Sequence, residues 1–293
     1  MNIKNAKSSV LRRLTVTPAI IIMTCIMVYP IIYNVYISFR YVTLVNLKTN
    51  GVFVGLDNYI TLFQDEAFIA SMITTIKYVI VTVLLQVLIA FILGMLTYRE
   101  RTVLRKVTTI SLLLPKMVTP SASALIWRFM LNYETGIINY FLTVLNLPKV
   151  AFLTNASTAM ISLSVIGVWQ NVGFSYLLIL SGLMAISYEI IEASLVEGAN
   201  LLNRIRYIIF PAMKPVLTVV TLFAVINAYQ TFDSVYITTG GGPAEATQVA
   251  SIFLYRKLFM SSQMGIAASI SVILLIVSFL ISLILIKALK RRD

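Results

Sequence analysis

The residues that most often carry enzyme chemistry are nearly absent from this chain. It contains no histidine and a single cysteine, Cys25, among 293 residues. Zinc sites and Ser-His or Cys-His pairs need those side chains, so the sequence predicts no catalytic residues and no metal site. The run from Gly240 to Gly242 lacks the Lys-Ser/Thr that completes a phosphate-binding loop. We therefore expect a protein that is not itself an enzyme.

One stretch combines amides, aromatic rings and glycine where its neighbours are apolar. It contains Trp169, Asn171, Gly173 and Tyr176. Amides hydrogen-bond to sugar hydroxyl groups, and aromatic faces pack on the C–H surfaces of sugars. The stretch could therefore line a carbohydrate pathway. In the alternative interpretation the amides only link helices, since such bonds in membranes contribute about 0.6 kcal/mol each.

A second polar stretch, residues 187–208, interrupts the apolar sequence. Helix-favouring residues run from Glu189 to Val196, and Gly198 can end or bend such a helix. A second helical run follows, and Pro211 is expected to mark entry into the next apolar segment. Small Ala193 and Ser194 would let another protein approach the backbone closely. The alternative is an ordinary amphipathic connector lying on the membrane surface.

The composition of the chain indicates that membrane-spanning helices must position these residues. Hydrophobic residues make up 59% of the chain and charged residues 12%, whereas soluble domains average about 25% charged residues. This excludes a cytosolic enzyme, a secreted disulfide scaffold and a nucleic-acid-binding domain. We expect an all-α polytopic membrane protein, because six apolar stretches are long enough to cross a bilayer: 14–39, 72–98, 104–131, 157–186, 209–234 and 264–287.

Lysine and arginine are distributed unevenly between the two sides of these spans. One side carries 15 and the other 5, which explains the net charge of +12 without nucleic acid. Because basic residues concentrate on the cytoplasmic side, we expect both termini in the cytoplasm. The first span is too long for a cleaved signal peptide and lacks an A-x-A-like site, so we expect a permanent helix.

Two cations fall within the third span. Lys116 lies between Pro115 and Pro120, so the span could be broken there, with the ammonium buried among helices or in contact with cavity water. It could instead meet an acidic sugar. Arg128 lies near the outer end and is expected to snorkel. No span has a carboxylate near its middle, so uphill transport would draw energy from another subunit.

The polar stretch at 187–208 resembles a known signature. Glu192, Ala193 and Ser194 are followed by Gly198 and Ala199, and then by Ile208 and Pro211. This order is similar to the "EAA" motif, E-A-A-x-x-x-G with I-x-L-P further on, of the membrane subunits of bacterial ABC importers. Ser194 replaces the second alanine and Phe210 replaces the leucine, and both are mild changes of size.

The resemblance extends over most of the chain. Residues 53–59 with Phe63, then Leu114-Pro115 and Trp127, then Gly240 to Pro243 with Tyr255, look like the carbohydrate-type permeases of that family. The chain is most similar to the MalF-like half of such importers. The resemblance implies a type I (MetI-like) permease fold, with 1–71 as tail, first helix and outer loop, 72–287 as the transport core, and 288–293 as a cytoplasmic tail.

The resemblance also implies roles for residues and partners. Residues that couple to an ATPase would be Glu192, Ala193, Ser194, Glu197, Gly198, Ala199 and Pro211. Pathway residues would be Trp169, Asn171, Gly173, Tyr176, Asn227, Tyr229, Gln230 and Lys116. Partners would be a second, MalG-type permease, two copies of an ABC ATPase that bind ATP and Mg, an extracytoplasmic solute-binding protein, a carbohydrate and membrane lipid. This chain would bind no cofactor and no nucleic acid, and would lie in the bacterial cell membrane.

Two other functional classes stay open from the residues alone. One is a secondary carrier or channel that needs no ATPase, and the other is a membrane enzyme or sensor. Co-purification with an ATPase would favour the importer, whereas transport by this chain alone would favour the carrier. The sequence does not identify the sugar.

Overall fold

The computed structural model describes residues 17–18, 20–43, 45–49, 51–100 and 102–290. The predicted start of the first span at residue 14 and residues 291–293 of the predicted tail lie outside this description. Nearly all regular structure is helical, and the chain divides into two compact units. Unit 1 comprises Met1–Glu66 and Leu254–Ile276, and unit 2 comprises Ala67–Phe253 and Val277–Asp293.

Unit 1 combines two apolar helices with a small polar cap. A π-helical turn (Thr24–Val28) leads into α2 (Tyr29–Ser38), and β1 (Arg40–Tyr41) pairs antiparallel with β2 (Val52–Phe53). A 3-10 turn (Leu47–Thr49) lies between the strands, and α3 (Asp57–Gln64) follows them. The buried Asn58 donates from Nδ2 to the carbonyls of Ser38 and Arg40 at 2.8 and 2.9 Å. One side chain therefore fixes the cap to the end of α2.

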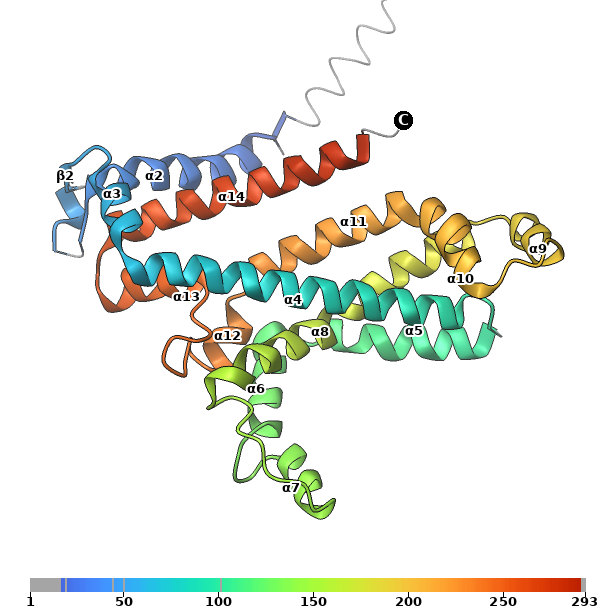
Figure 1. Ribbon diagram of the computed structural model, residues 1–293. Coiled ribbons are helices and arrows are strands. Elements are labelled where there is room, and N and C mark those ends of the chain that lie inside the picture. The colour runs from blue at the N-terminus through green and yellow to red at the C-terminus, as the bar shows by residue number, and fades with distance from the viewer. Residues whose placement is uncertain (1–16, 19, 44, 50, 101, 291–293) are drawn as a thin grey trace, which may run out of the picture. The chain divides into compact units, whose positions relative to one another are not determined.

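Unit 2 holds the long helices and several short ones (Figure 1). The long ones are α4 (Glu66–Thr97), α8 (Ala156–Met184) and α11 (Phe210–Tyr229), while α5 (Thr102–Met117) and α6 (Pro120–Met130) form a bent pair. The short ones are α7 (Ile137–Val144), α9 (Tyr188–Val196), α10 (Leu201–Arg204), α12 (Asp233–Thr238) and α13 (Ala250–Tyr255). After α13, the π-helical turn Arg256–Met260 and the part of α14 (Met264–Lys290) up to Ile276 belong to unit 1, and the rest of α14 belongs to unit 2.

The predicted spans correspond to helices that are long and apolar enough to cross a membrane. Among the described residues there are five such helices, or six if the bent pair of α5 and α6 counts as one span. The pair is bent by 98°, at the break that the prolines around Lys116 suggested. Pro120 begins α6 directly after Thr119, whose Oγ1 accepts a hydrogen bond from the Ala122 amide at 3.3 Å.

Two predicted boundaries are wrong. The second helix begins at Glu66 rather than near residue 72. The fifth helix, α11, ends at Tyr229 rather than near residue 234. Pro211 is the second residue of α11, at the entry that the sequence predicted, and the π-helical turn Ile205–Ile209 ends two residues before it. Such a local adjustment accommodates a residue that has no backbone donor.

Helix α8 is the centre of unit 2. Of its most apolar 18-residue window, 67% is buried, compared with 28% for α4. Tyr176, Ile179 and Leu183 of α8 are buried in one core cluster with Ala90 of α4 and Met213 of α11. A Cβ on Gly173 would lie 1.9 Å from the carbonyl oxygen of Leu112, so this glycine permits the close contact of α8 with α5.

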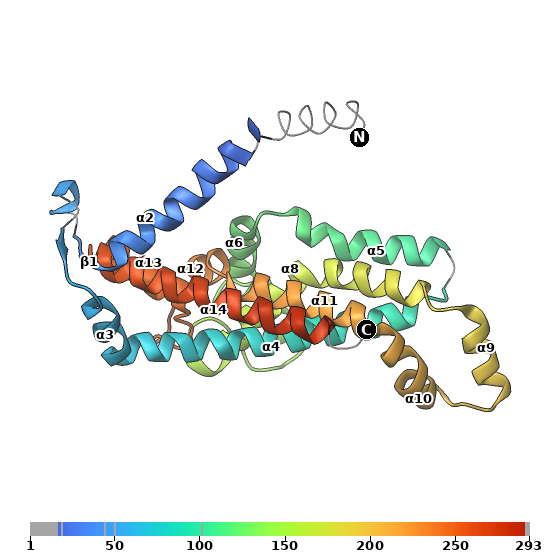
Figure 2. The ribbon, with the colours of Figure 1, turned by 90° about the horizontal axis from the view of Figure 1, so that it is seen from above.

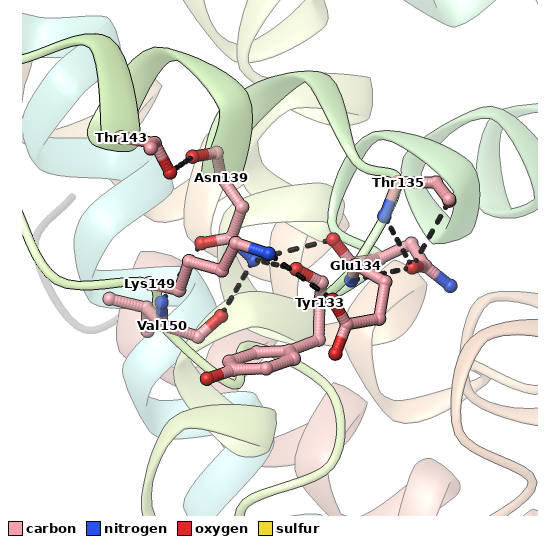
Figure 3. A network of polar contacts seen from close by, with 8 residues as sticks. Tyr133, Glu134, Thr135, Asn139, Thr143, Lys149 and Val150 are labelled. Atoms are coloured by element: carbon pink, nitrogen blue, oxygen red, sulfur yellow. Dashed lines mark hydrogen bonds and ion pairs between the residues drawn. The ribbon is translucent and has the colours of Figure 1, made fainter.

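A polar network holds the segment between α6 and α8 in place (Figure 3). The side chain of Asn139, on α7, is fully buried. Its Nδ2 donates to the carbonyls of Asn132, Tyr133 and Val150 at 3.0 to 3.3 Å, and its Oδ1 accepts from the Val150 amide at 2.9 Å. A buried amide with all these partners gives the segment one ordered conformation.

Candidate functional site

A polar cavity of about 190 Å³ lies inside unit 2. Its walls come from α4, from the junction of α5 and α6, from α8, and from the region where α11 gives way to α12. The lining residues are Tyr78, Thr82, Gln86, Lys116, Pro120, Gly167, Gln170, Asn171, Asn227, Ala228, Gln230, Thr231, Phe232, Asp233 and Ser234. Amides and hydroxyls therefore dominate a site enclosed by otherwise apolar helices.

The bend between α5 and α6 brings Lys116 to this cavity. Lys116 lies in the last turn of α5, and its Nζ donates to Asn171 Oδ1 on α8 at 2.6 Å. Asn171 Nδ2 in turn donates to the Gly167 carbonyl at 2.9 Å, which fixes the amide with its oxygen available to the ammonium. The charged group thus has a defined position at the wall.

Helix α4 contributes polar residues that the sequence interpretation missed. Tyr78, Thr82 and Gln86 are all buried and line the cavity. Gln86 Nε2 donates to Ser175 Oγ at 2.7 Å and to the Asn171 carbonyl at 3.3 Å. Their spacing of four residues places them on one face of an apolar helix, and this periodic signal was available in the sequence.

The α11–α12 region supplies the wall that carries the carboxylate. Asp233 lies in the first turn of α12, and its Oδ1 accepts a hydrogen bond from Ser121 Oγ at 3.1 Å. Gln170 donates from Nε2 to the Val118 carbonyl at 3.3 Å and to Ser123 Oγ at 3.4 Å. These two contacts join α8 to the bent pair beside the cavity.

The structure places four of the predicted pathway residues in the cavity and four outside it. Lys116, Asn171, Asn227 and Gln230 line it, whereas Trp169, Gly173, Tyr176 and Tyr229 do not. The roles of all eight residues in a pathway stay predictions.

Packing accounts for the positions of three of the residues outside the cavity. Tyr176 is fully buried and its hydroxyl lies 2.8 Å from Thr97 Oγ1. Gly173 provides room for α5, as described above. Trp169 packs edge-to-face on Trp127, with ring centroids 5.6 Å apart. Each of them joins helices, which was the alternative interpretation of this stretch.

Of the predicted coupling residues, Pro211 lies on α11, and the others lie on and around α9, at the end of unit 2 that α9 and α10 form (Figures 1 and 2). Gly198 has φ +77° and ends α9. Its amide donates to the Leu195 carbonyl at 3.0 Å, and the Ala199 amide donates to the Ser194 carbonyl at 2.9 Å. This is a Schellman motif, which needs the left-handed conformation that glycine adopts without strain. The prediction that Gly198 ends the helix is confirmed.

Exposure on α9 differs from what we expected at one residue. Glu192, Ala193 and Glu197 are exposed, but Ser194 is buried and its Oγ donates to the Ile191 carbonyl at 2.7 Å. Ser194 faces its own unit together with the buried Ile191, so the prediction that it opens the backbone to a partner is wrong. Ala193 is the small residue on the open face.

A second set of contacts links α9 to the end of α4. The Arg99 guanidinium lies 5.8 Å from the centroid of the Tyr188 ring. The Tyr188 hydroxyl donates to the Glu192 carboxylate, and this hydrogen bond raises the pKa of Tyr188 above its ordinary value. This hydrogen bond joins the Tyr188 hydroxyl to the Glu192 carboxylate on the exposed surface of α9.

No group of three or more His, Cys, Asp or Glu side chains comes together within the part of the chain that the structure describes. The expectation that the chain binds no metal and no cofactor stays a prediction.

Comparisons with known proteins identify the family. A family described as "Binding-protein-dependent transport system inner membrane component" matches residues 86–292. The chain is 32% identical over 270 residues to the trehalose/maltose transport system permease protein MalF of Thermococcus litoralis, covering 92% of this chain and 90% of the relative. It is 28% identical over 286 residues to the sulfoquinovosyl glycerol transport system permease protein SmoG of Agrobacterium fabrum, covering 96% and 90%.

A solved structure supports the fold. The crystal structure of a bacterial ABC transporter involved in the import of the acidic polysaccharide alginate superposes with a TM-score of 0.85 at 21% identity, covering 99% of this chain and 98% of that one. At this identity the likeness shows the fold alone. The all-α permease fold expected from the sequence is confirmed.

Proposed function

Because the chain belongs to the family of binding-protein-dependent transport system inner membrane components, we propose that it forms one half of the translocation pathway of an ATP-driven carbohydrate importer. It is a multi-pass membrane protein with several helices apolar enough to span a bilayer. Its relatives' names refer to trehalose and maltose, to a sulfoquinovosyl glycerol and to alginate. They agree on a carbohydrate and differ on which one.

The observation that carries the proposal is the combination, within unit 2, of a polar cavity and an exposed short helix. The cavity holds amides of Gln86, Gln170, Asn171, Asn227 and Gln230. Each amide presents two donors and an acceptor, which suits the many hydroxyls of a sugar. At about 190 Å³ the cavity is smaller than the roughly 300–1,000 Å³ of ordinary ligand pockets. A second, MalG-type permease would supply the opposite wall.

Coupling to ATP hydrolysis would take place at α9. Its open face carries Glu192, Ala193 and Glu197, and Gly198 and Ala199 cap its end. We propose that this face fits a cleft on one of two ATPase subunits, which would hold ATP and Mg. Closure of the two ATPases would move α9 and, through the helix that contains Pro211, the wall of the cavity. Such a population shift requires different contacts in the two states.

The proposed orientation follows from charge. Residues 187–208 lie on the side with 15 of the lysines and arginines, so α9 and both termini would face the cytoplasm. The opposite end of unit 2, with α6, α7 and α12, would face an extracytoplasmic solute-binding protein. Residues 72–287 would form the transport core of the subunit.

Reconstitution tests the proposal. The assembled complex in proteoliposomes should accumulate a labelled oligosaccharide only when ATP and the solute-binding protein are both supplied. The chain reconstituted alone should transport nothing. Uptake by the chain alone, abolished by an uncoupler, would contradict the proposal and identify a secondary carrier or channel.

A further inference from the structure

Lys116 is the one positively charged side chain among the residues that line the cavity. All other lining groups are neutral except the Asp233 carboxylate. Neutral sugars are bound by amides, hydroxyls and aromatic faces, and none of these requires a full charge. Burying a cation within a membrane span costs free energy. The binding of hydroxyl groups alone therefore does not explain why a lysine lies at this wall.

The ammonium has unused capacity to donate hydrogen bonds. It carries three donors, and its described partner is a neutral acceptor, Asn171 Oδ1, at 2.6 Å. It makes no ion pair with any carboxylate of the residues that the structure describes. Lys116 is exposed and lines the cavity, so an anionic group of a ligand can reach it without displacing a protein carboxylate.

The other charge in the cavity does not neutralise Lys116. Asp233 belongs to α12 and its Oδ1 accepts from Ser121 Oγ at 3.1 Å, so its hydrogen bond is made to α6 and not to the ammonium. The first turn of a helix also favours a carboxylate through the helix dipole. The two charges are thus held separately by different elements of the wall.

A purely structural role for Lys116 predicts a different geometry. A lysine in the last turn of α5 could fold back onto the free carbonyls at that helix end. The Lys116 ammonium instead reaches across to α8, where Asn171 is itself fixed by the Gly167 carbonyl. This contact holds the Lys116 ammonium at the cavity wall.

From this geometry we propose that the pathway takes a carbohydrate that bears an acidic group, a carboxylate or a sulfonate, and that Lys116 is a specificity-determining residue for that group. The inference rests on the proposed function of the same cavity. A charge-assisted hydrogen bond to the acidic group would form as the solute passes this wall. With a neutral sugar of the same shape, the Lys116 ammonium would keep its hydrogen bond to Asn171 and would gain no charged partner.

The first experiment identifies the charge of the solute. The melting temperature of the solute-binding protein that assembles with the importer is measured with each member of three matched pairs of ligands. The pairs are galactotriose and trigalacturonate, mannotriose and trimannuronate, and glucose and its 6-deoxy-6-sulfonate. We expect a raised melting temperature with the acidic member of a pair and not with the neutral one. Stabilisation by neutral members only would overturn the proposal.

The second experiment measures ATP-driven uptake of that acidic ligand by the complete importer in proteoliposomes. Lys116→Gln should lower uptake by roughly tenfold or more, because a charge-assisted hydrogen bond is lost. Lys116→Arg should retain most of it. Lys106→Gln, which removes a cation from an exposed position on the same helix, should change uptake less than about twofold.

The outcomes separate this inference from the proposed function. Normal uptake by Lys116→Gln would overturn the role of Lys116 while leaving an ATP-driven importer intact. Loss of uptake by Lys116→Gln and Lys116→Arg alike, with a lowered melting temperature of both complexes, would show a structural residue and also overturn it. Uptake by the wild-type complex that does not need ATP would contradict the proposed function instead.

Discussion

The eight residues predicted to line the pathway all have side chains or backbone suited to a sugar site, yet only four of them line the cavity. Asn171 lines the cavity, while Trp169 and Tyr176 on the same helix contact Trp127 and Thr97. Residue type alone could not distinguish these faces, because α8 is buried on most sides and polar groups occur all around it. The contribution of α4 was predictable from the four-residue spacing of Tyr78, Thr82 and Gln86.

Tyr176 gives a test of this division at the residue scale. Tyr176→Phe removes the hydroxyl that lies 2.8 Å from Thr97 Oγ1. We expect the free energy of unfolding in detergent to fall by about 0.5–1 kcal/mol. The KM for solute uptake should not change, because the ring stays in place and the hydroxyl is outside the cavity. A KM raised several-fold at unchanged stability would show instead that Tyr176 contacts solute.

At the scale of elements, glycines mark the places where helices must meet closely or end. The sequence indicated that Gly198 ends a short helix, because helix-favouring residues precede it, and the structure agrees. It could not indicate that Gly173 allows α8 to pack closely on α5, since α5 is remote in sequence. The break in the third span was predictable from Pro115 and Pro120, but its 98° bend was not.

The contact between α5 and α8 can be tested directly. Gly173→Ala places a methyl group where a Cβ would lie 1.9 Å from the Leu112 carbonyl oxygen. The helices must move apart, and we expect a loss of about 1–3 kcal/mol in the free energy of unfolding. Ser181→Ala, at an exposed position on the same helix, is the control and should change it by less than about 0.5 kcal/mol. Equal values for the two variants would contradict the packing.

The coupling role of α9 can be tested with two substitutions of equal size. No atom lies within 4 Å of a Cβ on Gly198, and aspartate and asparagine both tolerate its left-handed conformation. We expect Gly198→Asp to lower solute-stimulated ATP hydrolysis roughly tenfold or more, because a buried unpaired charge at an interface costs several kcal/mol. Gly198→Asn should be less impaired. If the Asp variant assembled and transported normally, the docking role of α9 would be wrong.

At the scale of the whole molecule, hydropathy was sufficient to locate the spans, and only their ends were misplaced. The division of the chain into two compact units was not predictable, because unit 1 joins Met1–Glu66 to Leu254–Ile276 across nearly the full sequence. Orientation rests on the distribution of lysine and arginine, which reflects insertion into the membrane rather than packing.

Cysteine labelling tests the orientation. After Cys25→Ser, single cysteines are placed at Leu145, which is 67% exposed beside α7, and at Val196, which is 89% exposed on α9. In intact cells a membrane-impermeant maleimide should react at position 145 and not at 196. Both should react after permeabilisation. Labelling of position 196 in intact cells would place α9 outside and contradict the proposed topology.

The contact between α9 and an ATPase is most directly measured by photocrosslinking. A photoreactive amino acid replaces Ala193, on the open face of α9, and a second variant carries it at Leu145 as a control. On irradiation of the assembled importer, position 193 should give an adduct containing the ATPase subunit, and position 145 should not. No ATPase adduct from position 193 in a complex that retains its ATPase would contradict the proposed coupling.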